Sequence, residues 1–232
     1  MIIIDEGPTL RFITQPDHAR FSSQLLELWL ADGLPRHRDR EQLLFAVREH
    51  DNGWREADAA PRVDPESAKA HDFLSFPDAE RLEVWKRGVD RYADSGSYAT
   101  LLILEHARVL HSPTAPHWQT FLDELDERRV ELLDQLNIGE PRLEADYRLL
   151  RLADKLSLAV CNKWQDPDQF SGYEFRSGDG FLSLRPFPLA GATTFSIPCR
   201  HIANRPFSGD ADLGGELAAA AWQEASVRVQ PL

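Results

Sequence analysis

The sequence predicts a mainly α-helical fold, a helical bundle that carries a small antiparallel β-sheet and is therefore α+β overall. Three observations support this prediction. Apolar residues recur at helical spacing between residues 14 and 165, short β-like stretches follow residue 170, and a hairpin pattern opens the chain. We expect a single domain over residues 1–232, with a helical core at 14–165. The segments 1–13 and 170–232 are expected to form the sheet as an appendage.

The chain is predicted to begin with a β-hairpin that leads into a helix. Residues 2–4 and 10–13 are mostly apolar and flank the turn-forming residues 5–8. Asp17 is a suitable N-cap for the first helix, which is expected to end near Gly33 and Pro35. The residues that share its inner face are His18, Phe21, Leu25, Leu28 and Trp29.

The second helix is predicted over residues 39–51 and contains the most informative pair of the chain, His50-Asp51. Leu43, Val47, His50 and Trp54 recur at helical spacing, so His50 lies on an apolar stripe with Asp51 at its edge. A carboxylate that faces a core is costly unless it is paired, protonated or bound to a metal. The pair therefore predicts polar partners elsewhere in the fold.

The remaining elements follow in order along the chain. Residues 56–77 are expected to form an irregular segment, either a roof over a site or a surface connection. Four further helices are predicted, at 78–92, 98–111, 116–136 and 141–163. Strands are predicted at 181–187, 193–197 and 222–229. The N-terminal hairpin is expected to join them, because an isolated hairpin is marginally stable in water.

Composition narrows the class of protein. The formal net charge of −12 disfavours binding to nucleic acid and to anionic membranes. The chain contains neither a signal-peptide pattern nor an apolar run long enough to span a membrane. Cys161 and Cys199 lack the spacing of a metal knuckle and are expected to be plain thiols. These features predict a cytoplasmic protein that acts on a small molecule. Three roles are open for the predicted sheet: it completes the fold, closes the site or forms the contact of a homodimer.

Residue types that ligate metals occur on the apolar stripes of four predicted helices. A bundle that brings three imidazoles and two carboxylates together can satisfy all of them with one or two divalent ions. Imidazole and carboxylate ligands favour Mn, Fe, Co, Ni or Zn. The candidate metal ligands are His18, His50, Asp51, His106 and Asp154. A single histidine on an apolar stripe is more often a core residue, and His106 fits either role.

The order of these residues resembles the HD-domain superfamily of metal-dependent phosphohydrolases. That resemblance implies an HD-like helical bundle in which His18, His50, Asp51 and Asp154 ligate the metal. The sequence is more closely similar to an uncharacterised bacterial family, domain of unknown function 3891. The segments that carry this similarity are 15–19, 50–54, 98–106 and 152–157, and the terminal strands also resemble that family. The similarity supports a metal site without naming a reaction.

We therefore expect a metal-dependent hydrolase of a phosphate ester, with an anionic, nucleotide-like molecule as one possible substrate. Hydrolysis needs a proton acceptor or donor and a cation that meets the phosphate. The candidates for these roles are Asp51, Glu56, Asp58 and Lys155. Two alternatives stay open: a di-iron oxygenase with the same helical core, and a non-catalytic module that binds a metal or ligand. No nucleophile-elbow, Walker or dinucleotide-binding pattern occurs.

Overall fold

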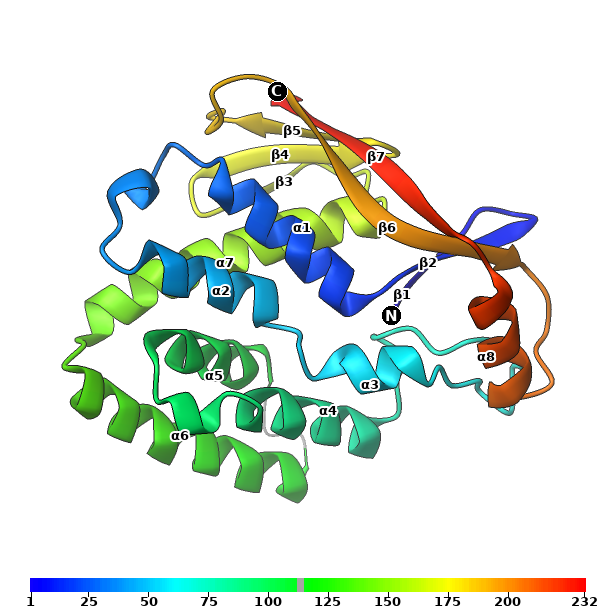
Figure 1. Cartoon of the computed structure of the whole chain (residues 1–232), viewed down its shortest axis with the longest axis horizontal. Coiled ribbons are helices and arrows are strands. Elements are labelled where there is room, and N and C mark those ends of the chain that lie inside the picture. The colour runs from blue at the N-terminus through cyan, green and yellow to red at the C-terminus, as the bar shows by residue number, and fades with distance from the viewer. Residues whose placement is uncertain (112–114) are drawn as a thin grey trace.

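A computed structural model describes residues 1–111 and 115–232 of the chain. Helices take up about half of the chain and strands about a fifth, so the protein has an α+β fold (Figure 1). The prediction of a mainly α-helical, HD-like bundle with a small antiparallel sheet is therefore wrong. The sheet is a major layer of the molecule, it contains seven strands, and it is mixed rather than purely antiparallel.

The sheet curls into a half-barrel above the helices (Figure 1). Its strand order is β1-β2-β6-β7-β5-β4-β3, and neighbours are antiparallel except β5 and β7, which are parallel. The strands are β1 (Ile2–Asp5), β2 (Thr9–Ile13), β3 (Asp168–Phe170), β4 (Tyr173–Gly178), β5 (Phe181–Arg185), β6 (Thr193–Ala203) and β7 (Trp222–Pro231). As expected, the N-terminal hairpin joins the sheet, because β2 pairs with β6.

The sheet exceeds the prediction because strands β3 and β4 were not predicted and because β6 continues beyond its predicted end at residue 197. Phe195, Ile197 and Cys199 are buried in alternation, as a strand with one covered face requires. Pro198 interrupts this pattern in the sequence, and proline is usually read as the end of a strand because it cannot donate a ladder hydrogen bond. In the fold, Pro198 lies opposite Glu224 of β7 and the pairing continues to Arg200.

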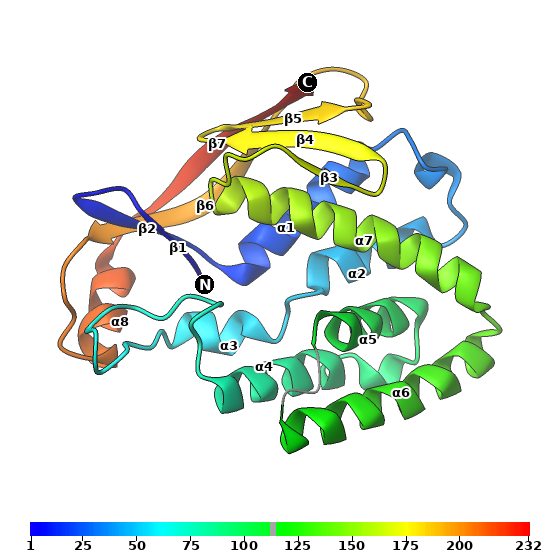
Figure 2. The ribbon, with the colours of Figure 1, turned by 180° about the vertical axis from the view of Figure 1, so that it is seen from behind.

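Eight α-helices are described; α1 to α7 lie in successive layers below the sheet, and α8 lies beside one end of it (Figures 1 and 2). They are α1 (Gln15–Glu27), α2 (Arg40–Glu49), α3 (Trp54–Ala59), α4 (Asp78–Asp90), α5 (Tyr98–Leu110), α6 (Pro116–Leu136), α7 (Glu140–Cys161) and α8 (Asp210–Ala219). Helices α1 and α7 contact each other and the sheet, α2 and α5 follow, and α4 and α6 pack against α5. Helices α3 and α8 were not predicted from the sequence.

The sheet and the helices share a hydrophobic core. Phe21 and Leu25 of α1 and Leu156 of α7 belong to the same buried cluster as Ile197 and Val229 of the sheet. Helix α8 covers one end of the sheet with a smaller cluster of its own. Members of that cluster are Phe12, Ile202, Leu213 and Leu217. This packing positions α1 and α7 as a floor between the sheet and the outer helices.

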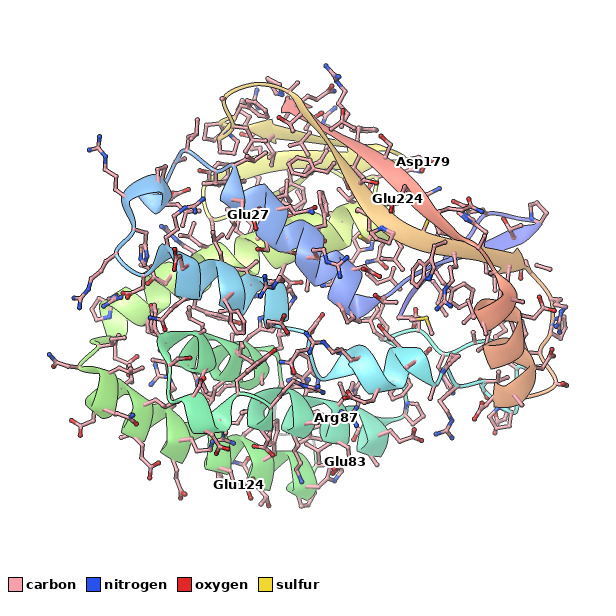
Figure 3. The ribbon with its side chains drawn as sticks, in the orientation of Figure 1. Glu27, Glu83, Arg87, Glu124, Asp179 and Glu224 are labelled. Carbon is pink, nitrogen blue, oxygen red and sulfur yellow. The ribbon has the colours of Figure 1, made fainter. Side chains whose placement is uncertain are left out.

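The surface carries many charged side chains on the outer helices. Figure 3 shows Glu83 and Arg87 on α4 and Glu124 on α6, on the side of the molecule remote from the sheet. The Oε1 atom of Glu83 lies 3.7 Å from the Nζ atom of Lys86. This ion pair is one of several on the exposed surface. In the part of the chain that the structure describes, no helix has the length and apolar character needed to cross a membrane.

Candidate metal centre

The His50-Asp51 pair lies in the turn between α2 and α3. Helix α2 ends at Glu49 with His50 as its C-cap, so Trp54 belongs to the next helix and not to the same stripe. The side chain of Asn52 fixes this turn: its Nδ2 donates to the carbonyl of Glu49 at 2.8 Å and to that of Gly88 at 3.0 Å. The turn is thereby attached to α4.

Gly53 permits this close attachment because it has no side chain. A Cβ atom at Gly53 would lie 2.0 Å from the carbonyl oxygen of Val84 and 2.9 Å from the amide nitrogen of Gly88. Both distances are too short for carbon, since non-bonded heavy atoms prefer about 3.5–4.0 Å. A second glycine, Gly88, lies across the contact on α4. The two glycines therefore set how closely the turn approaches α4.

Four buried side chains meet at one point between α1, the turn and α7. The Nε2 atom of His18 lies 3.2 Å from Asp51 Oδ2 and 3.5 Å from Asp154 Oδ1. The Nε2 atom of His50 lies 3.6 Å from the same oxygen of Asp51 and 3.4 Å from that of Asp154. Ligands about 2.1 Å from a tetrahedral ion are about 3.4 Å apart. The donor atoms thus have the spacing that a transition-metal site requires.

Hydrogen bonds orient both imidazole rings toward this point. Ser157 Oγ donates to the carbonyl of His18 at 2.9 Å, so the same oxygen accepts from the Nδ1–H of His18, also at 2.9 Å. The Nδ1–H of His50 donates to the carbonyl of Val47 at 2.6 Å. In both rings, Nε2 is left as the atom that faces Asp51 and Asp154. Such supporting hydrogen bonds are a regular feature of metal-ligating histidines.

The electrostatics of the group favour a bound cation. Burial by itself lowers the pKa of His50, but the charges of Asp51 and Asp154 outweigh burial and raise it to about 9. The pKa of each carboxyl is lowered in turn, although burial opposes the change, because His50 lies beside both of them. Among the described residues, the buried Nε2 of His50 has no hydrogen-bond partner. An unpaired nitrogen beside two carboxylates fits a metal ligand.

His106 of α5 adjoins the same group. Its ring centroid lies 4.7 Å from that of His50, and its Nδ1 is buried without a hydrogen-bond partner in the described part of the chain. Burial, together with the nearby charge of His50, lowers the pKa of His106 to about 3, so the ring is neutral. Two overlapping sets of side chains can hold a metal ion: His18, His50 and Asp51, and His50, His106 and Asp154.

A cavity of about 380 Å³ opens onto this cluster. Asp51, His106 and Asp154 line its floor. Phe73 and Leu74, from the irregular segment between α3 and α4, also line it, so that segment covers the site. The remaining lining residues are Gln15, Trp54, Arg81, Trp85, Leu110, His111, Trp118 and Leu158.

Three residues predicted to be catalytic lie outside this cavity. Glu56 is exposed and pairs with Arg87 at 3.0 Å and Arg91 at 2.6 Å. Lys155 points toward the sheet, where its Nζ lies 2.6 Å from Asp168. Both are engaged in ion pairs. Among the four candidates, only Asp51 lines the cavity.

Asp58 is buried on another side of α3. Its Oδ1 lies 2.5 Å from the amino group of Met1, and its Oδ2 accepts the backbone N–H of Gln15 at 2.6 Å. Burial raises its pKa despite these partners. Asp58 therefore joins the start of the chain and the start of α1 to α3, and it borders a second cavity beside Arg200 and Trp222.

Sequence reasoning missed several residues that the fold brings to the site. Ser157 follows Asp154 by three positions on α7, a spacing that places both side chains on one face of the helix. Gln15 precedes His18 by the same interval on α1. These spacings were signals in the sequence. Arg81 and Trp118 had no such signal, because they reach the cavity from helices that contact the ligand-bearing ones only in the tertiary structure.

The geometry thus defines a protein with a buried cluster of histidine and aspartate side chains that can hold a metal ion. The chain belongs to the family described as protein of unknown function (DUF3891), whose pattern matches residues 1–204. That match extends through β6 and stops before α8 and β7. No curated protein and no solved structure matches the chain. The resemblance to the uncharacterised family is confirmed, and membership of the HD-domain superfamily stays a proposal.

Proposed function

We propose that this protein is a metal-dependent hydrolase of phosphate esters. The observation that carries the proposal is the spacing of four donor atoms, from His18, His50, Asp51 and Asp154, at 3.2–3.6 Å beside a cavity. The order of these residues along the chain is also that of the HD-domain phosphohydrolases. The proposal rests on this ligand set and not on an HD-like fold.

The donor set indicates which ion is held and how many. Two imidazole nitrogens and two carboxylates suit Mn, Fe, Co, Ni or Zn. His50 belongs to both sets of possible ligands, but its Nδ1 is already bonded to Val47, which leaves one nitrogen for one ion. We therefore infer a single ion held by His18, His50, Asp51 and Asp154. His106, neutral and adjacent, then supplies a fifth donor or a hydrogen-bond partner at the cavity floor.

A divalent ion bound here neutralises phosphate charge and makes water at the site more acidic. The protein supplies the remaining requirements. Asp51 lines the cavity and has a second carboxylate oxygen, Oδ1, that can accept the proton of the attacking water. Arg81 is a cation at the cavity wall, and the aromatic side chains around it exclude bulk water. Each of these roles belongs to a residue in contact with the same cavity.

The test combines metal analysis with a hydrolysis assay. Protein purified without chelators is analysed for metals and assayed with p-nitrophenyl phosphate after reloading with Mn, Fe, Co, Ni or Zn. We expect close to one ion per chain and metal-dependent release of phosphate. Asp154→Asn is expected to abolish both. The matched control is Asp168→Asn, which removes a carboxylate that pairs with Lys155 on the far side of α7.

Each other outcome counts against the proposal. Two iron ions with a visible charge-transfer band would favour the oxygenase, and a stoichiometric ion without turnover of any phosphoester would favour a non-catalytic module. Protein without bound metal, whose stability and metal content do not change in Asp154→Asn, would remove the metal centre itself from consideration.

A further inference from the structure

Several aromatic rings wall the cavity beside the metal centre. Three of the six tryptophans of the chain line it: Trp54, Trp85 and Trp118. His111 stacks on Trp118 with ring centroids 4.5 Å apart and planes inclined by 8°, and its edge meets Trp85 at 4.7 Å. Burial lowers the pKa of His111, so at neutral pH it presents a neutral ring. Flat apolar surfaces of this kind bind planar rings.

Two of the residues that line this cavity carry buried polar atoms without partners among the described residues. Gln15 and Trp85 are both more than nine-tenths buried, and both line the cavity. Within the described residues, Gln15 Oε1 and Trp85 Nε1 have no hydrogen-bond partner. A buried polar atom left unpaired is costly, and native proteins seldom contain one without a ligand or water to satisfy it. Both unpaired atoms have almost no accessible surface and lie within the cavity wall, so a ligand or water must reach into that wall to pair with them.

The charge and volume of the cavity limit what it can hold. Arg81 is the single lysine or arginine among the described lining residues, and Asp78 already pairs with it at 2.6 Å. Asp51 and Asp154 add negative charge at the floor. A polyphosphate chain would therefore meet too little positive charge. A cavity of about 150 Å³ holds one benzene ring, so 380 Å³ accommodates a ring system with one further group.

We propose that the substrate is a phosphate monoester of a planar aromatic ring system, with the ring packed against the cavity wall that Trp85, His111 and Trp118 form. This inference rests on the proposed function for the position of the phosphate at the metal centre. The ring-binding part does not depend on turnover, because it follows from the walls of the cavity. Esters of small aliphatic alcohols and polyphosphates are expected to be poor ligands.

The experiment measures binding of two phosphonates that cannot be hydrolysed. Metal-loaded protein is titrated with phenylphosphonate and with methylphosphonate, by calorimetry and by the change in tryptophan fluorescence. We expect phenylphosphonate to bind at least about tenfold more tightly, in line with the discrimination that apolar pockets achieve. His111→Leu is expected to reduce this preference roughly two- to tenfold through the loss of an aromatic contact. His111→Phe, which restores a ring, is expected to restore the preference.

The outcomes separate this inference from the proposed function. Equal affinity for the two phosphonates would overturn the inference even if the protein hydrolyses phosphate esters. A preference for the phenyl compound without any hydrolysis would support the ring site and count against the hydrolase. If His111→Leu fails to fold, the comparison of the two phosphonates on the unaltered protein still decides the question.

Discussion

Replacing Gly53 by alanine tests how the turn that carries His50 and Asp51 is held. The new Cβ would lie 2.0 Å from the carbonyl oxygen of Val84, well inside contact distance, so α4 and the turn must separate by more than 1 Å. The backbone conformation of Gly53, with φ −65° and ψ −19°, is itself suitable for alanine. The effect therefore comes from the contact with α4 and not from backbone strain.

The expected cost follows from the groups that must move. Overpacking of this kind costs about 1–3 kcal/mol, and loss of the hydrogen bond from Asn52 to the carbonyl of Gly88 adds about 1 kcal/mol. Alanine also lowers the conformational entropy of the unfolded chain, which offsets about 0.4–1 kcal/mol of this loss of stability. We expect Gly53→Ala to lower the free energy of unfolding by about 2 kcal/mol. Metal affinity is expected to fall as well, since the turn positions Asp51.

Urea unfolding followed by tryptophan fluorescence measures the first effect, and chelator competition measures the second. The matched control is Gly215→Ala, an exposed glycine inside α8 whose new Cβ would meet no atom within 4 Å. That control is expected to raise stability by up to about 1 kcal/mol through helix propensity. A Gly53→Ala variant with unchanged unfolding midpoint and unchanged metal affinity would refute this account of the turn.

Three further predictions concern the metal centre. Ser157→Ala is expected to weaken metal binding about 10–100-fold, because Ser157 orients His18. The control is Ser177→Ala, which removes another buried hydroxyl, bonded to the carbonyl of Ala159, and is expected to leave metal binding unchanged. Chelator competition compares the two variants. The pKa of His50 in the metal-free fold is raised from 6.5 to about 9, so its contribution to stability is complete below pH 6.5 and is lost as the pH rises through about 9. Urea unfolding of metal-free protein from pH 6 to 9.5 should follow this decline, and a flat profile would contradict it. Glu56→Gln and Lys155→Gln are each expected to leave metal affinity and the rate of hydrolysis within about twofold of the unaltered protein, because neither residue lines the cavity. A loss of turnover above tenfold in either variant would show that the substituted residue takes part in catalysis.

The ligand cluster could be predicted from the sequence because its members are polar residues at positions where the helical pattern predicts apolar ones. Asp154 interrupts an apolar stripe between Leu150 and Leu158, and His18 lies on the inner face of its helix. Burying such groups is costly without partners, so their presence on apolar stripes predicts that the partners exist. The structure places His18, His50 and Asp154 at the same point with buried side chains. Periodicity along single helices carried this information.

The number of strands in the sheet and their order could not be predicted from the pattern of residues along single elements. Strand β3 has three residues and β4 has two buried aromatic residues, Tyr173 and Phe175, so neither was predicted. Strand β7 was predicted, but its neighbours in the sheet were not. Its pairing with β6 on one side and β5 on the other joins segments distant in the sequence. Edge and half-covered strands need few apolar residues, so composition underestimates them. The roles of Asp58 and Lys155 were hidden for a related reason, since their partners are set by long-range contacts.

The sequence by itself determined which side chains require buried polar partners, because helical spacing assigns each residue to a face before any tertiary contact forms. His50 was identified from its spacing to Leu43 and Val47, and Asp51 as its neighbour in the sequence. Only the tertiary structure decided that they lie in a turn held by Gly53 against α4, and that an aromatic cavity opens beside them. It also decided the α+β architecture, because strand order and cavity walls arise from contacts between distant segments that no local periodicity records.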